Sequence, residues 1–429
     1  MLEEVNNLHD SFLPLENNYK LLDNYQHLRL MYILVNAISN VPAYRNLKYL
    51  KSELVDNSFL ALRKFPVVEK KKILKRYSDY ISSHYNGDFC YSTKTSGSTG
   101  VPFVTIKDDF AYIQSLADTI KIFHHYNIAR GSRILRIAGR IEGFQIEPSV
   151  PADLYTLALV GINSSSTNFN IEILKQIIKF SPEIISGHSS EILLLHRLLE
   201  KNGLLKDFNN VQYVFSGGEL LHVPTKKYLE QALHAKVIDS YGLQEIGDIA
   251  YQCDKYPEYY HIHDNSVYLE VIDSEGNQVM PGNRGEFVAT SLNNITMPFI
   301  RYRTGDYGVI SASPCKCGKS SGIIQILEGR SMQPILLAGG DLLNPYILKR
   351  KFEDLKVSQY QVVQNEPGKI IINIVLGQFT VKENVYTFVK ALNNETNDGT
   401  VFSVKFCEIS DIISENGKVK PFISNIEVS

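Results

Sequence analysis

Between about residue 90 and residue 310, short apolar runs alternate with amphipathic stretches, and this alternation limits the possible folds more than any other feature. Strand-length runs that alternate with helix-length stretches are typical of layered α/β folds. The predicted strands of this region lie at 211–215, 237–239, 267–272 and 286–290. We therefore predict an α/β architecture of layered sheets and helices.

One helix of this region can be placed residue by residue. Its apolar side chains recur at helical spacing on one face, at Ile192, Leu195, Leu198 and Leu199. Ser190 has a side chain suited to capping a helix N-terminus, and Gly203 stands where the helix should end. We predict a helix over 190–202 with Ser190 as its N-cap.

The N-terminal segment has a helical pattern. Residues 8–75 carry apolar side chains at helical spacing, among them Leu30, Ile33 and Leu34, until Pro42 interrupts the pattern. We expect this segment to cap a larger domain.

The C-terminal segment changes to a small α+β pattern beyond Arg330. Its predicted elements are strands at 361–364, 370–376 and 402–407 and a helix at 384–392. A chain of 429 residues exceeds the length that one hydrophobic core usually organises. We expect two domains, 1–330 and 331–429.

Charge and cysteine content exclude several classes of protein. The formal net charge of -2 lacks the basic excess of a nucleic-acid binder. No stretch is apolar enough for a membrane span, and the N-terminus lacks the basic and apolar segments of a secretory signal. The five cysteines are too few and too irregular for a secreted disulfide framework. We expect a cytoplasmic protein, with its oligomeric state left open.

A loop rich in glycine and hydroxyl groups follows a Tyr-rich run and precedes the strand-like 103–106. Glycine lets the backbone approach a ligand closely, so such a loop offers N–H groups and hydroxyls to a phosphate. It lacks the lysine of a Walker loop. A surface turn is the alternative interpretation. The loop residues are Thr95, Ser96, Gly97, Ser98, Thr99 and Gly100.

Further segments, in the same order, make the chain resemble the adenylate-forming superfamily of acyl-CoA synthetases, luciferases and peptide-synthetase adenylation domains. They are Ser216-Gly217-Gly218-Glu219, Tyr241-Gly242-Leu243-Gln244-Glu245, Arg301-Tyr302-Arg303-Thr304-Gly305-Asp306, Gly329-Arg330 and Gly417-Lys418. Val41-Pro42-Ala43-Tyr44-Arg45 and Cys315-x-Cys317-Gly318 resemble the phenylacetate-CoA ligase branch, which includes relatives found with capsular polysaccharide biosynthesis. The resemblance implies a large N-terminal adenylate-forming domain and a small, mobile C-terminal lid.

The resemblance implies an ATP site. The loop would hold the β- and γ-phosphates, and Glu245 would bind the Mg²⁺ that bridges them. Tyr241 would stack on adenine, and Asp306 would accept the two ribose hydroxyls. The implied nucleotide-binding residues besides the loop are Ser216, Gly217, Gly218, Glu219, Tyr241, Gly242, Gln244, Asp306 and Arg330.

Lys418 corresponds to the catalytic lysine of the family, and Lys420 is the competing candidate. An ammonium beside the carboxylate and the leaving pyrophosphate would stabilise the transition state more than the substrates. The chain departs from the family pattern at Gln244, where a hydroxyl residue is usual, and after Arg330, where the hinge residue differs.

Four residues suit a tetrahedral zinc site: Cys253, His261, Cys315 and Cys317. His263 is an alternative to His261, and scattered reduced cysteines are the alternative to a metal site. Four protein ligands would leave no open position, so we expect a structural role for this zinc.

The sequence thus predicts an ATP-dependent ligase that activates a carboxylic acid and passes it to coenzyme A. An amine or sugar acceptor is the nearest alternative, and a non-catalytic nucleotide-binding protein is the alternative of another class. The sequence does not identify the acid.

Overall fold

Backbone contacts divide the chain of the computed structural model into two units, Met1–Arg130 with Ser240–Ser331, and Gly131–Asp239 with Met332–Ser429. The second segment of each unit is distant from the first along the sequence. The structure describes residues 1–85, 87, 90–95, 103–138, 143–147, 150–162, 171–330, 335–343, 348, 351–352, 355, 357–377, 380–396, 398–414 and 417–426.

The first unit begins with the predicted helical segment. Its long helix α2 ends before Pro42, because Val41 is already extended and proline has no N–H for a further helical bond. The helices are α1 (Leu2–Phe12), α2 (Tyr19–Asn40), α3 (Lys51–Asp56), α4 (Ser58–Leu62) and α5 (Lys70–Lys75), with short 3₁₀ turns at Leu13–Leu15, Pro42–Leu50 and Tyr77–Tyr80. Buried residues of α2, including Leu30, Ile33 and Leu34, form one core with Phe103 and Phe299.

The first unit continues with a hairpin, a helix and an antiparallel sheet. The hairpin is β1 (Cys90–Thr95) with β2 (Phe103–Asp108), followed by α6 (Asp109–Tyr126). The sheet runs in the order β11-β12-β13-β14-β10-β9-β8. Its strands are β8 (Lys236–Leu243, which crosses the unit boundary), β9 (Gly247–Gln252), β10 (Tyr260–Ile262), β11 (Val267–Ile272), β12 (Arg284–Ser291), β13 (Tyr302–Ile310) and β14 (Ile323–Arg330).

The second unit contains a mostly parallel sheet in the order β7-β6-β3-β5-β4, in which β4 is antiparallel to β5. Apolar side chains from α7, α8 and α9 pack with those of the strands in one core. The elements are β3 (Arg133–Ile137), β4 (Phe144–Glu147), β5 (Thr156–Val160), α7 (Ile171–Phe180), β6 (Ile184–Gly187), α8 (Ser189–Lys201), a 3₁₀ turn (Leu205–Asp207), β7 (Tyr213–Gly217) and α9 (Val223–Leu233).

The predicted helix over 190–202 is present as α8, but Ser190 is not its N-cap. The helix begins at Ser189, and His188 is the N-cap residue. The Ser190 hydroxyl lies 2.9 Å from both oxygens of Glu219 and 2.9 Å from the carbonyl oxygen of Gly417. The hydroxyl that was predicted to cap the helix therefore bonds to residues outside the helix.

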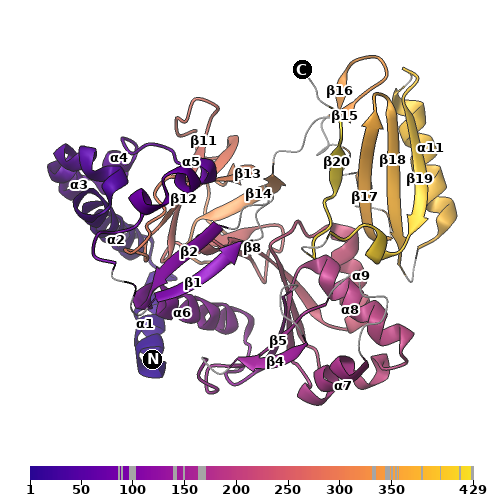
Figure 1. Cartoon of the computed structure of the whole chain (residues 1–429), viewed down its shortest axis with the longest axis horizontal. Helices are drawn as coiled ribbons and strands as arrows, with labels where there is room; N and C mark the ends of the chain where they lie inside the picture. The colour runs from indigo at the N-terminus through magenta and orange to yellow at the C-terminus, as the bar shows by residue number, and fades with distance from the viewer. Residues whose placement is uncertain are drawn as a thin grey trace. The chain divides into compact units, whose positions relative to one another are not determined.

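The C-terminal part of the second unit has a separate, smaller sheet in the order β19-β18-β17-β20. Figure 1 shows α11 lying along one face of this sheet. The elements are β15 (Ile335–Leu336), β16 (Leu342–Leu343), β17 (Val357–Glu366), β18 (Lys369–Leu376), α11 (Lys382–Thr396), β19 (Val401–Cys407), a 3₁₀ turn (Ile409–Asp411) and β20 (Phe422–Ser424).

The α/β prediction is thus confirmed, with a small α+β part at the C-terminus. The predicted strand at 267–272 is β11, residue for residue. In the part of the chain that the structure describes, no helix is long and apolar enough to cross a membrane.

Candidate nucleotide site and metal centre

The predicted phosphate loop joins β1 to β2. These strands pair from Cys90 opposite Asp108 to Thr95 opposite Phe103. Ser96, Gly97, Ser98, Thr99 and Gly100 lie outside the described residues, as does the side chain of Thr95. Both flanking strands occur as predicted, and the phosphate-binding role of the loop stays a prediction.

Tyr241 and Asp306 lie together, although 65 residues separate them in the sequence. The Tyr241 hydroxyl donates to a carboxylate oxygen of Asp306 at 3.0 Å, and both side chains are buried. Gly305 has a φ of +78°, which a side chain would strain, and the Asp306 N–H donates to the Thr304 hydroxyl at 3.0 Å. The Asp306 carboxylate bonds to a distant tyrosine, so a simple turn does not explain its position.

Arg330 stands opposite Asp306 on the neighbouring strand, because β13 and β14 pair these two residues. The side chain of Arg330 is not described. The strand register therefore brings the backbone of the predicted hinge residue beside the predicted ribose ligand.

Glu245 follows β8 and is buried. The Lys70 ammonium and the Tyr302 hydroxyl lie 3.2 Å and 3.3 Å from one of its oxygens. Gln244, the adjacent departure from the family pattern, is exposed. A carboxylate held by a neighbouring cation has a fixed direction, and its hard oxygens suit an ion such as Mg²⁺.

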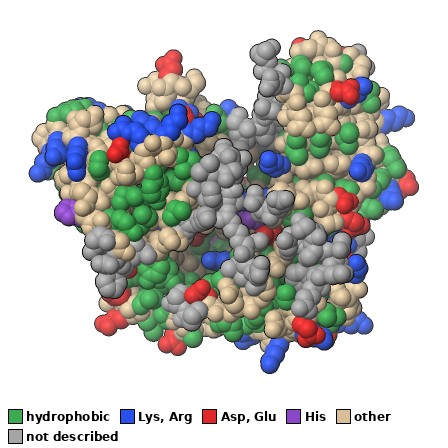
Figure 2. Space-filling model, viewed as in Figure 1, with side chains coloured by type: hydrophobic (Ala, Val, Ile, Leu, Met, Phe, Trp, Pro, Cys, Tyr) green, Lys and Arg blue, Asp and Glu red, His purple; other side chains and the backbone are tan. Residues whose placement is uncertain are grey.

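Lys70 was missed by the sequence analysis. It begins α5, whose run of lysines is typical of a solvated helix face. Lys71, Lys72 and Lys75 are indeed exposed, and Figure 2 shows a row of basic side chains where α5 lies at the surface. No signal in the sequence distinguishes Lys70 from these neighbours.

Gly242 has a local reason to be glycine. A Cβ at this position would lie 2.8 Å from the carbonyl oxygen of Gly247, on the neighbouring strand β9. The backbone of the Tyr241–Glu245 segment can therefore approach β9 only without a side chain at this point.

In the second unit, Lys418 reaches the segment predicted to border adenine. Its ammonium donates to the carbonyl oxygen of Gly218 at 2.5 Å. Gly218 has a φ of +77°, and Ser216 is fully buried at the end of β7. Lys420, the competing candidate, is exposed. The geometry thus favours Lys418 over Lys420.

The Glu219 carboxylate stabilises the start of α8 and holds the Lys418 strand. It accepts from the backbone N–H of Ser190 at 2.7 Å, from the Ser189 hydroxyl at 2.6 Å and from the N–H of Val419 at 3.1 Å. A carboxylate at a helix N-terminus is favoured by the unpaired N–H groups there. Glu219 thereby fixes the backbone next to Lys418.

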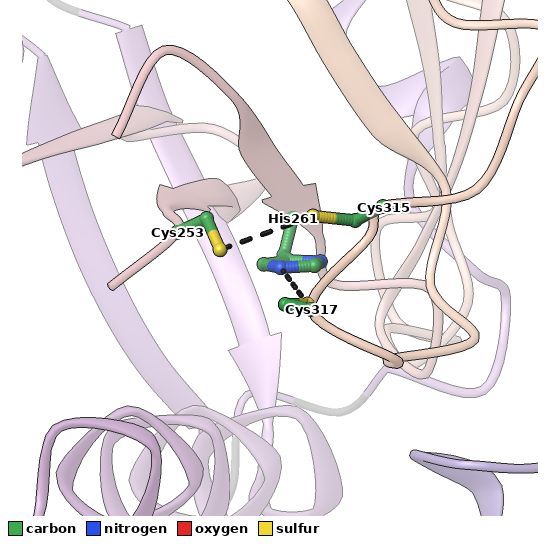
Figure 3. Close-up of side chains that lie close together, drawn as sticks. All are labelled: Cys253, His261, Cys315 and Cys317. Carbon is green, nitrogen blue, oxygen red and sulfur yellow. Dashed lines mark hydrogen bonds between the residues drawn. The ribbon is translucent and has the colours of Figure 1, made fainter. Parts of the chain in front are cut away.

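Four potential metal ligands converge in the first unit. The ligand atoms of Cys253, His261, Cys315 and Cys317 all lie within 4.8 Å of one another. Figure 3 shows the His261 imidazole directed at Cys317, with Nε2 and Sγ 3.2 Å apart, and Cys253 and Cys315 place their sulfurs 3.9 Å apart. Three sulfurs and one imidazole nitrogen at this spacing fit tetrahedral zinc.

The surroundings of this cluster orient its ligands. The Nδ1 atom of His261 lies 2.8 Å from the Ser321 hydroxyl, which leaves Nε2 for the metal. Burial lowers the pKa of His261 to about 3, so its imidazole is neutral. The Tyr256 N–H donates to the sulfur of Cys253 at 3.4 Å. His263 does not join the cluster in the described structure, so the geometry favours His261 over this alternative.

The chain is similar to known CoA ligases in fold and in sequence. No protein-family model matches the chain. The fold is similar to that of a 2-hydroxyisobutyryl-CoA ligase in a postadenylation state, with a TM-score of 0.74 at 16% identity over 93% of this chain and 89% of that one. The chain therefore shares its α/β fold, with the smaller C-terminal sheet, with this ligase.

The chain is also similar in sequence to curated proteins. The chain is 25% identical over 357 residues to the phenylacetate-coenzyme A ligase of Pseudomonas putida, covering 79% of this chain and 76% of the relative. It is 22% identical over 380 residues to Protein CapK of Staphylococcus aureus, covering 85% and 81%. The predicted resemblance to phenylacetate-CoA ligases is confirmed.

Proposed function

We propose that the protein is an AMP-forming ligase that activates a carboxylic acid with ATP and transfers the acyl group to coenzyme A. The similarity to a phenylacetate-coenzyme A ligase along 79% of the chain carries this proposal. A fold shared with a 2-hydroxyisobutyryl-CoA ligase supports it. The reaction takes place in the cytoplasm, where ATP and coenzyme A are available.

The nucleotide binds along the predicted motifs. Residues 95–100 hold the phosphates, Tyr241 and the backbone of 216–219 contact adenine, and Asp306 accepts the ribose hydroxyls with help from Arg330. The 3.0 Å contact between Tyr241 and Asp306 supports a shared nucleotide-binding role for these two residues. Asp306 has two carboxylate oxygens, which is the acceptor geometry that a ribose diol requires.

Glu245 is the protein ligand for Mg²⁺. A single buried carboxylate fits an ion that takes its other oxygens from phosphates and water. The ion neutralises charge on the phosphates when it is bound. Lys70 contacts the same carboxylate at 3.2 Å and holds it in position before the nucleotide arrives.

Lys418 acts in the chemical step. The substrate carboxylate attacks the α-phosphorus of ATP, the bond to the β-phosphate oxygen breaks, and pyrophosphate leaves. An ammonium at this point stabilises charge that builds up on the oxygens in the transition state. Its 2.5 Å bond to Gly218 supports a position next to the adenine segment.

Transfer to coenzyme A then releases AMP, as the thiol attacks the acyl carbon of the adenylate. We assign residues 1–330 to an adenylation domain and residues 331–429 to a mobile lid that serves both half-reactions. The Cys253, His261, Cys315 and Cys317 cluster holds a structural zinc, since its four ligands leave no position for substrate.

The test is exchange of labelled pyrophosphate into ATP, screened over a panel of carboxylic acids with Mg²⁺. Acid-dependent exchange is expected for at least one acid. The acid that supports exchange is then offered with coenzyme A and, separately, with amines and amino sugars, and products are identified by mass spectrometry. Acyl-CoA formation at a rate near that of exchange supports the proposal. Rapid amide formation with no thioester would show that the acceptor is an amine instead of coenzyme A.

Nucleotide binding with no exchange for any acid would instead indicate a non-catalytic nucleotide-binding protein. Calorimetry with ATP provides that measurement on the same protein preparation.

A further inference from the structure

A polar pocket lies beside Glu245, wholly within the first unit. Lys107 of β2, Gln114 and Asp118 of α6, and Asp248 of β9 line it together with Glu245. It holds about 40 Å³ of space, enough for roughly three water-sized groups. Most of its lining side chains are polar, which is unusual because small-molecule pockets are mostly apolar.

Asp118 fixes the orientation of the Gln114 amide in this pocket. Gln114 donates through Nε2 to the Asp118 carboxylate at 3.1 Å. The same carboxylate accepts from the amide of Asn265 at 2.6 Å and from the hydroxyl of Ser266 at 2.5 Å. Three donors thus converge on the Asp118 carboxyl group, and the Gln114 amide lies with Nε2 toward it and Oε1 away from it.

The other end of the Gln114 amide lacks a partner. Within the described residues no group donates to its Oε1 atom, although the side chain is only 2% exposed. A buried acceptor without a partner destabilises the protein, so a ligand group that donates to this oxygen is favoured. Gln114 therefore supplies an acceptor that the described part of the chain leaves unused.

Lys107 supplies a donor to the same pocket. Burial lowers the pKa of its ammonium, and the carboxylates of Asp248 and Asp118 oppose this effect. A Cβ on Gly247, next to Asp248, would lie 3.7 Å from the Lys107 nitrogen, so the ammonium stands close to the turn after Glu245. A donor and two acceptors, Gln114 and Asp248, thus face one small space.

We propose that this pocket binds the hydroxyl group of a short hydroxylated carboxylic acid, which is the substrate class of the enzyme. A hydroxyl both donates and accepts, and Gln114 or Asp248 can accept from it while Lys107 donates to it. An apolar acyl chain would leave the buried Gln114 oxygen without a donor among the described residues. Glu245 lines the pocket and is the proposed Mg²⁺ ligand, so an acid bound here has its reacting end near the phosphates. This inference rests on the proposed ligase function.

The experiment compares acids that differ only by hydroxyl against methyl. Suitable pairs are 2-hydroxyisobutyrate with 2,2-dimethylpropanoate, and 3-hydroxybutyrate with 3-methylbutanoate. The measured quantity is the ratio of kcat/KM for pyrophosphate exchange within each pair. The wild-type protein is expected to favour the hydroxylated member of at least one pair by about tenfold or more, since sites built to bond a hydroxyl reject analogues that lack it.

Gln114→Leu and Lys107→Met are expected to lower this ratio by about tenfold, chiefly through poorer use of the hydroxylated acid. Thr119→Ala is the matched control, because Thr119 lies on the same helix and bonds only the backbone of Ser115 in the described structure. Its ratio should equal that of the wild type. Thermal unfolding of each variant separates a change of specificity from a loss of folded protein.

The outcomes separate the pocket from the ligase function. Exchange that favours the methyl acids, or an unchanged ratio in Gln114→Leu, overturns the pocket assignment while the ligase function stands. Absence of exchange with every acid overturns the ligase function. Calorimetry with 2-hydroxyisobutyrate then tests the pocket assignment. Binding to the wild-type protein that is lost in Gln114→Leu supports the assignment, and absence of binding to the wild-type protein overturns it.

Discussion

The cysteine cluster occupies the same unit as Tyr241, Glu245 and Asp306 of the nucleotide motifs, but the polar groups of the two regions are arranged in opposite ways. In the cluster, four ligand atoms face one another within 4.8 Å and leave no open position around a metal. At the nucleotide motifs, Glu245 contacts Lys70 and Asp306 contacts Tyr241. A substrate group can bind next to each of these pairs. We expect the first arrangement to stabilise the fold and the second to prepare a ligand site, so changes in the two regions should affect different measurements.

The largest expected effect is on stability, from Cys317→Ser. Removing one of four ligands should release the zinc and lower the free energy of unfolding by more than about 4 kcal/mol, the range of lost metal sites. The activity per folded molecule should change little. Elemental analysis and thermal unfolding measure these effects. Cys407→Ser is the matched control, because Cys407 lies in β19 outside the cluster. Elemental analysis that finds no metal in the purified wild-type protein would contradict the zinc assignment.

The next effect is on rate, from Lys418→Ala. Loss of one preorganised charged donor should reduce pyrophosphate exchange by about 100- to 1,000-fold. Stability and ATP affinity, from thermal unfolding and calorimetry, should remain near those of the wild type. Lys420→Ala controls for the loss of a nearby exposed charge. If Lys420→Ala abolishes exchange and Lys418→Ala does not, the catalytic assignment moves to Lys420.

A smaller effect is expected on nucleotide affinity. Asp306→Ala should weaken ATP binding by about 1.5–3 kcal/mol, because the ribose hydroxyls lose a charged acceptor. Calorimetry with ATP provides the measurement. Unchanged ATP affinity in Asp306→Ala would show that Asp306 does not bind the ribose.

The smallest effect is expected from Tyr241→Phe. This change keeps the ring that is proposed to stack on adenine and removes the hydroxyl with its 3.0 Å bond to Asp306, so it should cost about 0.5–1.5 kcal/mol of ATP affinity. A loss as large as that of Asp306→Ala would show that the hydroxyl itself contacts the nucleotide.

Local signals in the sequence predicted the elements well. Proline at 42 ends α2, and β-branched and apolar alternation places β11 at Val267–Ile272. The N-cap of α8 was wrong by two residues, because the Ser190 hydroxyl bonds Glu219 and Gly417 instead of capping its helix. A capping signal is local, whereas the competing partners lie far along the chain.

The candidate site was predictable where residue type alone is informative. Cysteine and histidine suggest metal ligands by residue type, and the structure brings the four predicted side chains together. The ordered motifs singled out Glu245, Asp306 and Lys418, whose roles stay predictions. Lys70 was not predictable, since its contact with Glu245 spans 175 residues. Gln114 and Lys107 were equally unpredictable from the sequence, because the role of a single amide or ammonium depends on the groups around it in the fold.

The most direct test of the central claim follows the oxygen atoms of the acid. An acid that supports exchange is labelled with ¹⁸O in its carboxylate and turned over with unlabelled ATP, Mg²⁺ and coenzyme A, and the nucleotide product is analysed by mass spectrometry. If an acyl-adenylate forms, the thioester step leaves one ¹⁸O atom on AMP, because the carboxylate oxygen that attacked the α-phosphorus stays with it. Unlabelled AMP, or ADP as the nucleotide product, would contradict the account.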